Sequence, residues 1–417
     1  MITPHMRDAD VAIIGAGAAG LMAAIWAGRV IPRNATLRRV VLLDGAKRIG
    51  AKILVSGGGR CNITHDLVDA SSFAGSTPNA IRKVLQRFDA SSSIDFFARL
   101  GVELNREDTG KVFPVTDDAH TVLEALLGEV TRLPLELRTS FRVEELNREK
   151  DGTFEIVGAA GAIRVGRLVL ATGGCSLPRT GSDGHGHAMA RRLGHSITPR
   201  VFPALVPLTL PERHLVRSLS GLTIRAALEV RSARGKRLAS FTDSTLCTHF
   251  GLSGPSVLDI SRYYLDARAH DPTAALVINW LPGETVESID RLLQTRDDRS
   301  VVAVLRGRLP ERLSRALCEE AAVEPGLPIS RLSRDARRSL ARMICELPLP
   351  ITGDRGFKVA EVTAGGVPLR ELNLATMESR VCPGLFLCGE ICDVDGRIGG
   401  YNFQWAWASG YVAGVSV

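Results

Sequence analysis

The sequence predicts an α/β fold in which a parallel sheet with flanking helices is interrupted by a large insertion. Residues 11–14 form an apolar run that enters a glycine turn and an alanine-rich helix, and residues 40–43 form a second apolar run typical of a buried parallel strand. A further strand over residues 168–171 again ends in a glycine turn. From Pro199 the chain changes character, and strand, turn and helix patterns resume only after residue 349. Both ends of the chain are therefore expected to build one domain around the insertion.

Length and composition are those of an ordinary globular protein. With 417 residues the chain is longer than one hydrophobic core normally supports, and its 45% hydrophobic and 23% charged residues exclude a disordered chain. The net charge of +7, carried mostly by arginine, suits an anionic ligand, a nucleic acid or good solubility, and does not choose among them. Eight scattered cysteines without a Cys-x-x-Cys motif, and no recognisable secretory signal, favour a reduced, cytoplasmic protein. No metal site is expected.

One uncharged stretch resembles a membrane span in length only. Residues 11–28 carry no charge and reach the lower limit of about 18 residues for crossing a bilayer. Glycine and alanine make up more than half of the stretch, and the glycines have the spacing of a nucleotide-binding loop. We therefore expect no membrane contact.

The first glycine turn has the pattern of a dinucleotide-binding loop. Gly15 permits the tight turn, Gly17 lets the backbone approach a pyrophosphate, and Gly20 lets the following helix pack closely on the sheet. The N–H groups and positive dipole end of that helix would hold the phosphates. Asp44, which ends the next strand, would accept hydrogen bonds from the adenosine ribose. The wide separation of Asp44 from the glycines is attributed to a loop over residues 30–37. The alternative for the glycine turn is a packing turn that binds no ligand.

The remaining elements are expected from local patterns. Residues 81–133 are predicted to be largely helical, with Asp117 or Asp118 capping the last helix. Three alternating segments, at residues 135–139, 141–146 and 154–157, predict a small antiparallel meander. Residues 401–414 are expected to form the final helix. Trp405 and Trp407 on it are expected in the core.

Further glycine loops add candidate contacts. The loop Ser56-Gly57-Gly58-Gly59-Arg60-Cys61-Asn62 follows Lys47 and Lys52, and its glycines would let the backbone lie against a flat ring or a phosphate. A flexible turn is the alternative for the loop, and Cys61 is interpreted as a packing or contact residue rather than a redox-active thiol. His185 and His187 follow the turn at Ala171-Thr172-Gly173-Gly174 and are interpreted as loop histidines. His249 and Ser253 would touch substrate only if their loop folds over the site; a structural turn is preferred.

The C-terminal run from Gly389 to Asn402 is the most informative part of the sequence. A strand ending in Gly389-Glu390, with an acidic residue beyond it, would bind the hydroxyls of a ribityl chain. Gly399 and Gly400 open the last helix, whose N-terminus carries about half a positive charge. That charge would favour the negative charge that develops on a reduced flavin ring.

These motifs resemble the BaiN-like and aminoacetone oxidase family of NAD(P)/FAD-dependent oxidoreductases. The matching stretches are IIGAGAAGLMAA, KILVSGGGRCNITH, ATGGCSLPRTGSDGHG, THFGLSGP, AEVTAGGV, TMESR and GLFLCGEICDVDGRIGGYNFQWAWASGYVAG. SGGGRCN, TMES and GGYN with QWAW are specific to this group, whereas many flavoproteins share the first glycine motif. Two departures stand out: Asp44 replaces a more usual glutamate, and His185 and His187 replace acidic and aromatic residues.

The resemblance implies a Rossmann-like FAD-binding domain of the two-dinucleotide-binding-domain flavoprotein type, interrupted by a β-barrel-like plus helical insert. The expected domains are 1–198 with 350–417 for FAD, 199–283 as a β-rich insert on the substrate side, and 284–349 as a helical insert. FAD would be held noncovalently. The cofactor contacts that the motifs and the resemblance imply are Gly15, Ala16, Gly17, Ala18, Ala19, Gly20, Asp44, Gly45, Lys47, Lys52, Ser56, Gly57, Gly58, Arg60, Cys61, Asn62, Val143, Ala171, Thr172, Gly173, Gly389, Glu390, Asp393, Gly399, Gly400, Tyr401 and Asn402.

The expected function is hydride transfer between FAD and a small organic substrate. Two enzyme types stay open: an amine or aminoketone oxidase that passes electrons to dioxygen, and a reductase that takes hydride from NAD(P)H as a transient donor. No residue stands out as catalytic acid or base. The expected partners are a small-molecule substrate, no nucleic acid and no membrane, in a monomer or homodimer. A non-catalytic alternative is an RNA-binding flavoprotein, suggested by the arginine-rich helical stretch, or a redox sensor.

Overall fold

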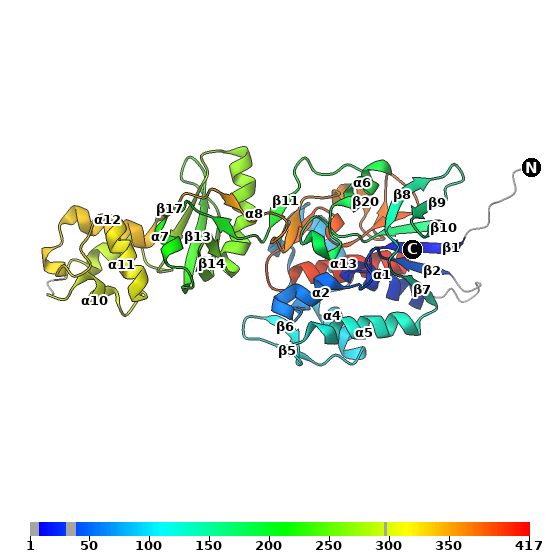
Figure 1. The fold of residues 1–417 in the computed structure, drawn as a ribbon, viewed down its shortest axis with the longest axis horizontal. Helices are drawn as coiled ribbons and strands as arrows, with labels where there is room; N and C mark the ends of the chain where they lie inside the picture. Colours follow the sequence, from blue (N-terminus) through cyan, green and yellow to red (C-terminus); the bar gives the residue numbers. More distant parts are fainter. Residues whose placement is uncertain (1–7, 31–38, 296–297) are drawn as a thin grey trace, which may run out of the picture. The chain divides into compact units, whose positions relative to one another are not determined.

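The computed structural model describes residues 8–30, 39–295 and 298–417, and the chain divides into two compact units (Figure 1). Unit 1 comprises Met1–Pro203 and Ala360–Val417, and unit 2 comprises Ala204–Val359. Each unit has its own cluster of buried apolar side chains. The loop predicted over residues 30–37 lies almost entirely outside the described residues.

Unit 1 is built on a nine-stranded sheet whose central strands are parallel. β1 pairs with β2 on one side and β10 on the other, and Ile13 lies opposite Leu42 and Val169. β7 continues the parallel order beyond β2, and β22 continues it beyond β10. Because these strands are parallel, their carboxyl ends share one edge of the sheet. Their bounds are β1 Ala9–Ile14, β2 Val40–Leu43, β7 Leu135–Arg138, β10 Gly161–Leu170 and β22 Leu385–Leu387.

The predicted antiparallel meander is correct for only two of its three segments. β8 (Val143–Arg148) and β9 (Phe154–Gly158) do pair antiparallel, and β9 continues onto the first half of β10. The segment over residues 135–139 is wrong as a meander strand, since β7 pairs parallel with β2. The four residues of β7 alternate between apolar and charged side chains, and so short a pattern does not distinguish the two kinds of pairing. The sheet ends beyond β22 with β21 (Glu378–Ser379) and β20 (Leu372–Asn373).

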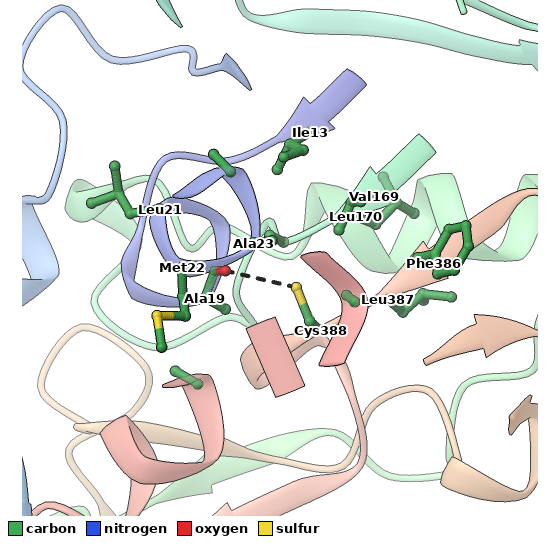
Figure 2. Packing of buried hydrophobic residues seen from close by; sticks show 14 of the residues in the cluster. Ile13, Ala19, Leu21, Met22, Ala23, Val169, Leu170, Phe386, Leu387 and Cys388 are labelled. Carbon is green, nitrogen blue, oxygen red and sulfur yellow. Dashed lines mark hydrogen bonds between the residues drawn. The ribbon is translucent and has the colours of Figure 1, made fainter. Parts of the chain in front are cut away.

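Small residues let the first and last helices of unit 1 pack closely together. A Cβ added at Gly410 or Gly414 of α13 (Tyr401–Ser416) would lie 2.5 Å from a carbonyl oxygen of α1 (Ala18–Arg29). Figure 2 shows the core beside α1, where the Cys388 thiol approaches the carbonyl of Ala19. The predicted final helix is confirmed. The other helices of unit 1 are α2 Ala51–Val55, α3 Pro78–Leu85, α4 Ala90–Arg99, α5 Ala119–Arg132 and α6 His185–Arg192, with short turns η1 Ser56–Gly59, η2 Ala70–Ser72, η3 Pro178–Thr180, η5 Leu369–Glu371 and η6 Gly389–Ile391.

The prediction that residues 81–133 are largely helical is wrong between α4 and α5. A hairpin of β5 (Leu104–Arg106) and β6 (Lys111–Pro114) lies there, extended by β3 (Thr64–His65). These strands are too short to show a period of their own, so the flanking helical pattern obscured them. The cap was predicted correctly, because the Asp118 side chain accepts from the N–H of His120. The remaining strands are β4 Phe73–Gly75, β11 Phe202–Ala204, β19 Val362–Ala364 and β23 Val394–Gly396.

Unit 2 contains a seven-stranded antiparallel sheet in the order β17-β16-β13-β14-β15-β12-β18. Its long central hairpin, β13 with β14, packs against α8. The helices of residues 286–345 bury Leu305, Leu313, Leu317 and Leu340 in the core of this unit. Within the described residues, no helix combines the length and apolar character needed to cross a bilayer. The elements are β12 Leu208–Thr209, α7 Leu215–Ser218, β13 Thr223–Arg231, β14 Arg237–Thr248, β15 Gly251–Ser253, α8 Pro255–His270, β16 Ala275–Asn279, α9 Val286–Leu292, α10 Val301–Leu305, α11 Glu311–Glu320, η4 Ile329–Arg331, α12 Arg334–Cys345, β17 Leu347–Leu349 and β18 Gly353–Asp354.

Candidate functional site

The carboxyl ends of four adjacent parallel strands bring the predicted loops of unit 1 to one edge of its sheet. β1 ends directly before Gly15, β2 before Asp44, β10 before Ala171, and β22 shortly before Gly389. This edge is where open parallel sheets bind ligands. Loops from both ends of the sequence thus meet beside one another.

The turn after β1 combines tight packing with open space. Gly15 has a φ of +102°, and a Cβ there would lie 2.5 Å from the carbonyl oxygen of Ala171, so only glycine fits. A Cβ on Gly20 would collide with the Gly15 carbonyl. A Cβ on Gly17, in contrast, would meet no atom within 4 Å. Gly17 gives α1 no side-chain cap, so N–H groups at the start of the helix, including those of Ala18 and Ala19, can serve an anion in that space.

Asp44 orients the same turn from the end of β2. Its Oδ2 accepts a hydrogen bond from the N–H of Ala16, and its Oδ1 accepts one from the N–H of Ala46, both at 2.7 Å. Each carboxylate oxygen has a second lone pair, so the predicted ribose contact stays possible. Gly45 and Lys47 beyond it are exposed.

The second glycine loop joins α2 to β3. Gly58, with a φ of +70°, borders space in which a Cβ would meet no atom within 4 Å. Cys61 is buried, and this burial raises the pKa of its thiol to about 12, so the thiol stays protonated at neutral pH. The side chain of Asn62 is also buried, and its Oδ1 has no hydrogen-bond partner among the described residues. Ser56 turns its hydroxyl onto the Ile53 carbonyl at 2.7 Å.

The Arg60 side chain binds protein partners. Its guanidinium carbon lies 3.9 Å from the centre of the Phe113 ring, and Nη1 pairs with Glu107 at 2.9 Å and Asp117 at 3.3 Å. These contacts tie the glycine loop to the β5–β6 hairpin and to the turn before α5. A cofactor contact of Arg60 would therefore come from its backbone.

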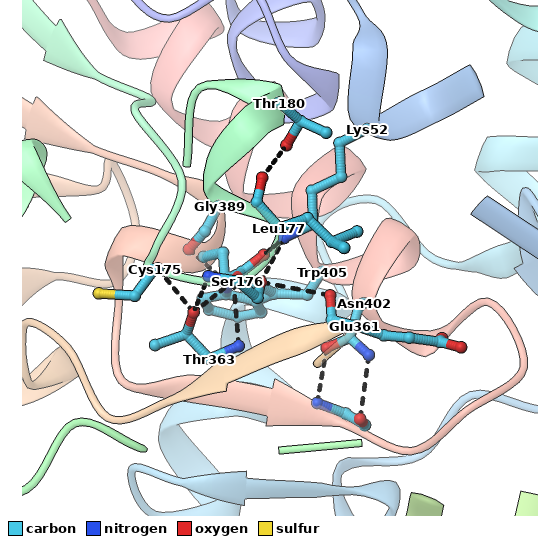
Figure 3. Close-up of polar contacts among 12 residues, drawn as sticks. Lys52, Cys175, Ser176, Leu177, Thr180, Glu361, Thr363, Gly389, Asn402 and Trp405 are labelled. Atoms are coloured by element: carbon cyan, nitrogen blue, oxygen red, sulfur yellow. Dashed lines mark hydrogen bonds and ion pairs between the residues drawn. The ribbon is translucent and has the colours of Figure 1, made fainter. Parts of the chain in front are cut away.

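A carboxylate network joins α2, the turn after β10, β19 and η6 (Figure 3). Glu390 Oε2 pairs with Lys52 Nζ at 2.5 Å, and its Oε1 accepts from Ser176 Oγ at 2.6 Å and from the N–H and hydroxyl of Thr363. Lys52 also donates to Ser176 Oγ at 2.6 Å. Burial alone would raise the pKa of Glu390, but the Lys52 charge and these hydrogen bonds outweigh it and hold the pKa below its usual range. Both oxygens of Glu390 thus already serve the fold.

The turn after β10 contains a second buried polar atom without a partner in the described part of the chain, this time a hydroxyl. Thr172 Oγ1 has no hydrogen-bond partner among the described residues, and Gly186 at the start of α6 faces this side chain with no room for a Cβ. The interpretation of His185 and His187 as loop histidines is wrong, since both lie in the first turn of α6, and they engage different partners. His185 Nε2 lies 3.1 Å from the Val143 carbonyl, whereas His187 Nδ1 lies 3.9 Å from the Cys175 sulfur.

The C-terminal loop is fixed by its own backbone. The Asn402 amide accepts from the N–H of Gly396 at 2.8 Å and donates to its carbonyl at 3.0 Å. A Cβ on Gly400 would lie 2.5 Å from the Thr64 backbone, so α13 starts close against β3. The Tyr401 ring stacks on His65, with 5.0 Å between ring centres. Gly399 precedes this start, and Asp393, buried beside β4, accepts from Ser76 Oγ at 3.3 Å.

The two tryptophans of α13 are core residues, as predicted. Trp405 and Trp407 are 2% and 0% exposed, and their indole N–H groups donate to the carbonyls of Gly389 and Ile63. His249 belongs to unit 2, where it lines a cavity of ≈ 580 Å³ with His214 and Arg217. Ser253 ends β15 in the same unit.

The residues at the sheet edge fit a bound dinucleotide cofactor. Open space beside Gly17 and Gly58 lies next to backbone N–H groups, and Asn62 and Thr172 each present a buried polar atom without a partner. Leaving such an atom unpaired costs about 1–3 kcal/mol, so a cofactor that supplied the partner would remove this cost at both residues. The sequence interpretation missed Ser176 and Thr363 as individual residues, although both stand inside quoted motifs. Only the three-dimensional structure identifies these two residues as part of the site, because both donate hydrogen bonds to Glu390.

The chain is similar to known proteins over nearly its whole length. The family described as HI0933-like protein Rossmann domain matches residues 9–416. The 3-dehydro-bile acid delta(4,6)-reductase of Clostridium scindens is 36% identical over 409 residues, covering 97% of this chain and 98% of that protein. The ribosomal RNA dihydrouridine synthase of Escherichia coli is 32% identical over 410 residues, covering 97% of each. Among solved structures, a 3-ketosteroid-delta4-(5alpha)-dehydrogenase from Rhodococcus jostii RHA1 aligns with a TM-score of 0.49 and 15% identity, covering 99% of this chain and 98% of that chain.

The family match and the two relatives confirm the resemblance seen in the sequence motifs. The chain belongs to the HI0933-like protein family with a Rossmann domain, and it is an FAD-dependent oxidoreductase.

Proposed function

We propose that this protein reduces a carbon–carbon double bond that is conjugated with a carbonyl group. The names of two relatives similar over nearly the whole chain support this reaction: one is a delta(4,6)-reductase of a 3-dehydro-bile acid, and the other forms dihydrouridine. Both names describe the saturation of such a bond. The overall reaction adds a hydride to one carbon and a proton to the other, and oxidises NAD(P)H to NAD(P)⁺.

The chain would hold the cofactor through the loops at the sheet edge. The N–H groups at the start of α1 would bind the pyrophosphate in the space beside Gly17. Asn62 Oδ1 would accept, and the Thr172 hydroxyl would donate or accept, the hydrogen bonds that the protein itself leaves unmade. Bound FAD supplies the hydride chemistry. The positive end of α13, after Gly399 and Gly400, would favour negative charge on a flavin ring next to it. Reduction of the flavin would then be easier.

The Lys52–Glu390 pair would act as a support rather than as a proton donor. Each oxygen of Glu390 is hydrogen-bonded, and the ammonium group of Lys52 donates to Glu390 and Ser176. Such a pair fixes α2 against the turn after β10 and β19, and thereby positions the second glycine loop.

An anaerobic titration of the holoprotein tests the proposal. We expect NADPH or NADH to bleach the visible flavin band, and a conjugated enone to restore it, whereas the corresponding saturated ketone does not. Bleaching by amines or aminoketones alone, with hydrogen peroxide released in air, would instead establish the oxidase alternative and overturn the reductase.

A further inference from the structure

The positive charge of the chain is concentrated in unit 2. Residues 204–359 contain 23 Lys and Arg against 18 Asp and Glu, so they carry +5 of the net charge of +7. Of these 23 basic residues, 21 are arginine. The guanidinium group presents a planar fork of donors that matches phosphate oxygens, which makes arginine the usual residue for binding nucleic acid.

Helix α12 gathers part of this charge into a line. Its inner face buries Leu340 and Ile344 in the core of unit 2. Arg334, Arg338 and Arg342 are exposed and follow one another at intervals of four residues, so they lie on one face about 6 Å apart along the axis. We call these three residues the arginine stripe.

Among the described residues, none of the three guanidinium groups of the stripe forms an ion pair. Hydrogen bonds lower the pKa of Glu287, and Arg338 is close enough for its charge to lower this pKa further, but the two groups do not form an ion pair. The neighbouring Arg337 differs, because it pairs with Asp290 at 2.6 Å and both side chains are only 14% exposed. Like charges four residues apart destabilise a helix by a few tenths of a kcal/mol per pair. Arg337 is paired within the fold, whereas the three exposed side chains of the stripe are accessible to a partner.

We propose that the arginine stripe binds the sugar–phosphate backbone of RNA that carries the uracil base to be reduced. The inference rests on the proposed reaction, because the C5–C6 double bond of uracil is conjugated with the C4 carbonyl and RNA is the polyanion that bears it. A membrane surface fits less well. Among the described residues, no large apolar side chain is exposed between positions 284 and 349, so the helical part offers nothing to insert between lipids.

The test is binding of a short fluorescein-labelled oligouridylate to the holoprotein, followed by anisotropy at several KCl concentrations. We expect Arg334→Gln/Arg338→Gln/Arg342→Gln to weaken binding at least tenfold at low salt. Because three phosphate contacts are lost, the slope of log K against log salt should become shallower by about 2. Removing the like charges should leave thermal stability equal or slightly higher, which separates lost binding from lost folding.

The matched control removes the same charge from unit 1, in Lys83→Gln/Arg99→Gln/Arg132→Gln, whose side chains are exposed. Equal loss of RNA binding in both variants, unchanged binding in the stripe variant, or preferred binding to phosphatidylglycerol vesicles or duplex DNA would each overturn the proposal. Reduction of a small free enone is measured in parallel and should survive in the stripe variant. If the wild type binds RNA but reduces no enone and no uridine, the proposed reaction fails while the RNA surface stands.

Discussion

At the scale of single residues, the pair of Glu390 and Lys52 makes stability depend on pH. The pKa of Glu390 is lower in the folded protein, since the Lys52 charge and hydrogen bonds from Ser176 and Thr363 outweigh the cost of burial. Such a carboxyl stabilises the fold above its unfolded pKa of about 4.3, and this contribution is lost as the pH falls through the folded pKa.

We therefore expect Glu390→Gln to lower the free energy of unfolding at pH 7 by about 2–4 kcal/mol, because Lys52 keeps its charge but loses its carboxylate. The difference from wild type should shrink as the pH falls below the unfolded pKa of about 4.3 toward the lower folded pKa, because the carboxyl of the unfolded chain then binds a proton before that of the folded protein. Urea unfolding across this pH range measures both effects. Glu144→Gln, at an exposed position of β8, is the control and should change neither value. An equal loss of unfolding free energy at pH 7 and below about pH 4 would show that the ionised form of Glu390 is not what stabilises the fold.

At the scale of elements, a substitution at the start of α1 should weaken cofactor binding without affecting folding. A Cβ at Gly17 would enter open space, and the φ of −83° at this position is one that any residue adopts. Gly17→Val should thus leave the unfolding free energy of the FAD-free protein within about 0.5 kcal/mol of wild type. The same side chain would fill the space next to the helix N-terminus, so the FAD dissociation constant should rise at least tenfold. Isothermal titration with FAD, beside urea unfolding of the FAD-free protein, checks the two values.

The control for this prediction is a glycine whose space the fold itself occupies. Gly410→Ala on α13 places a Cβ 2.5 Å from the Ala19 carbonyl and should destabilise the FAD-free protein by about 1–3 kcal/mol. A Gly17→Val protein that binds FAD normally would contradict the placement of the pyrophosphate beside α1.

The elements that the sequence predicted well are those with a local pattern. The first β-α-β unit and the final helix show continuous apolar runs or glycine punctuation within a few residues, which suffices for their assignment. The β5–β6 hairpin has three- and four-residue strands and was missed. The Glu390 network was missed for a different reason, since Lys52 and Glu390 are 338 positions apart and no local spacing marks the pair.

At the scale of the whole molecule, the two units have separate hydrophobic cores, and the loops at the sheet edge all belong to unit 1. FAD that binds the folded form of unit 1 alone stabilises only that unit, by about 2.7 kcal/mol when its concentration is 100 times the dissociation constant. We expect calorimetry of the protein to show two unfolding transitions, with added FAD raising the midpoint of one. Limited proteolysis above the lower transition identifies the unit that has unfolded, by the fragments that persist. Gly17→Val supplies the control, since its transitions should no longer respond to FAD. A single transition, or an equal shift of both, would mean that unit 2 shares in cofactor binding or unfolds only together with unit 1.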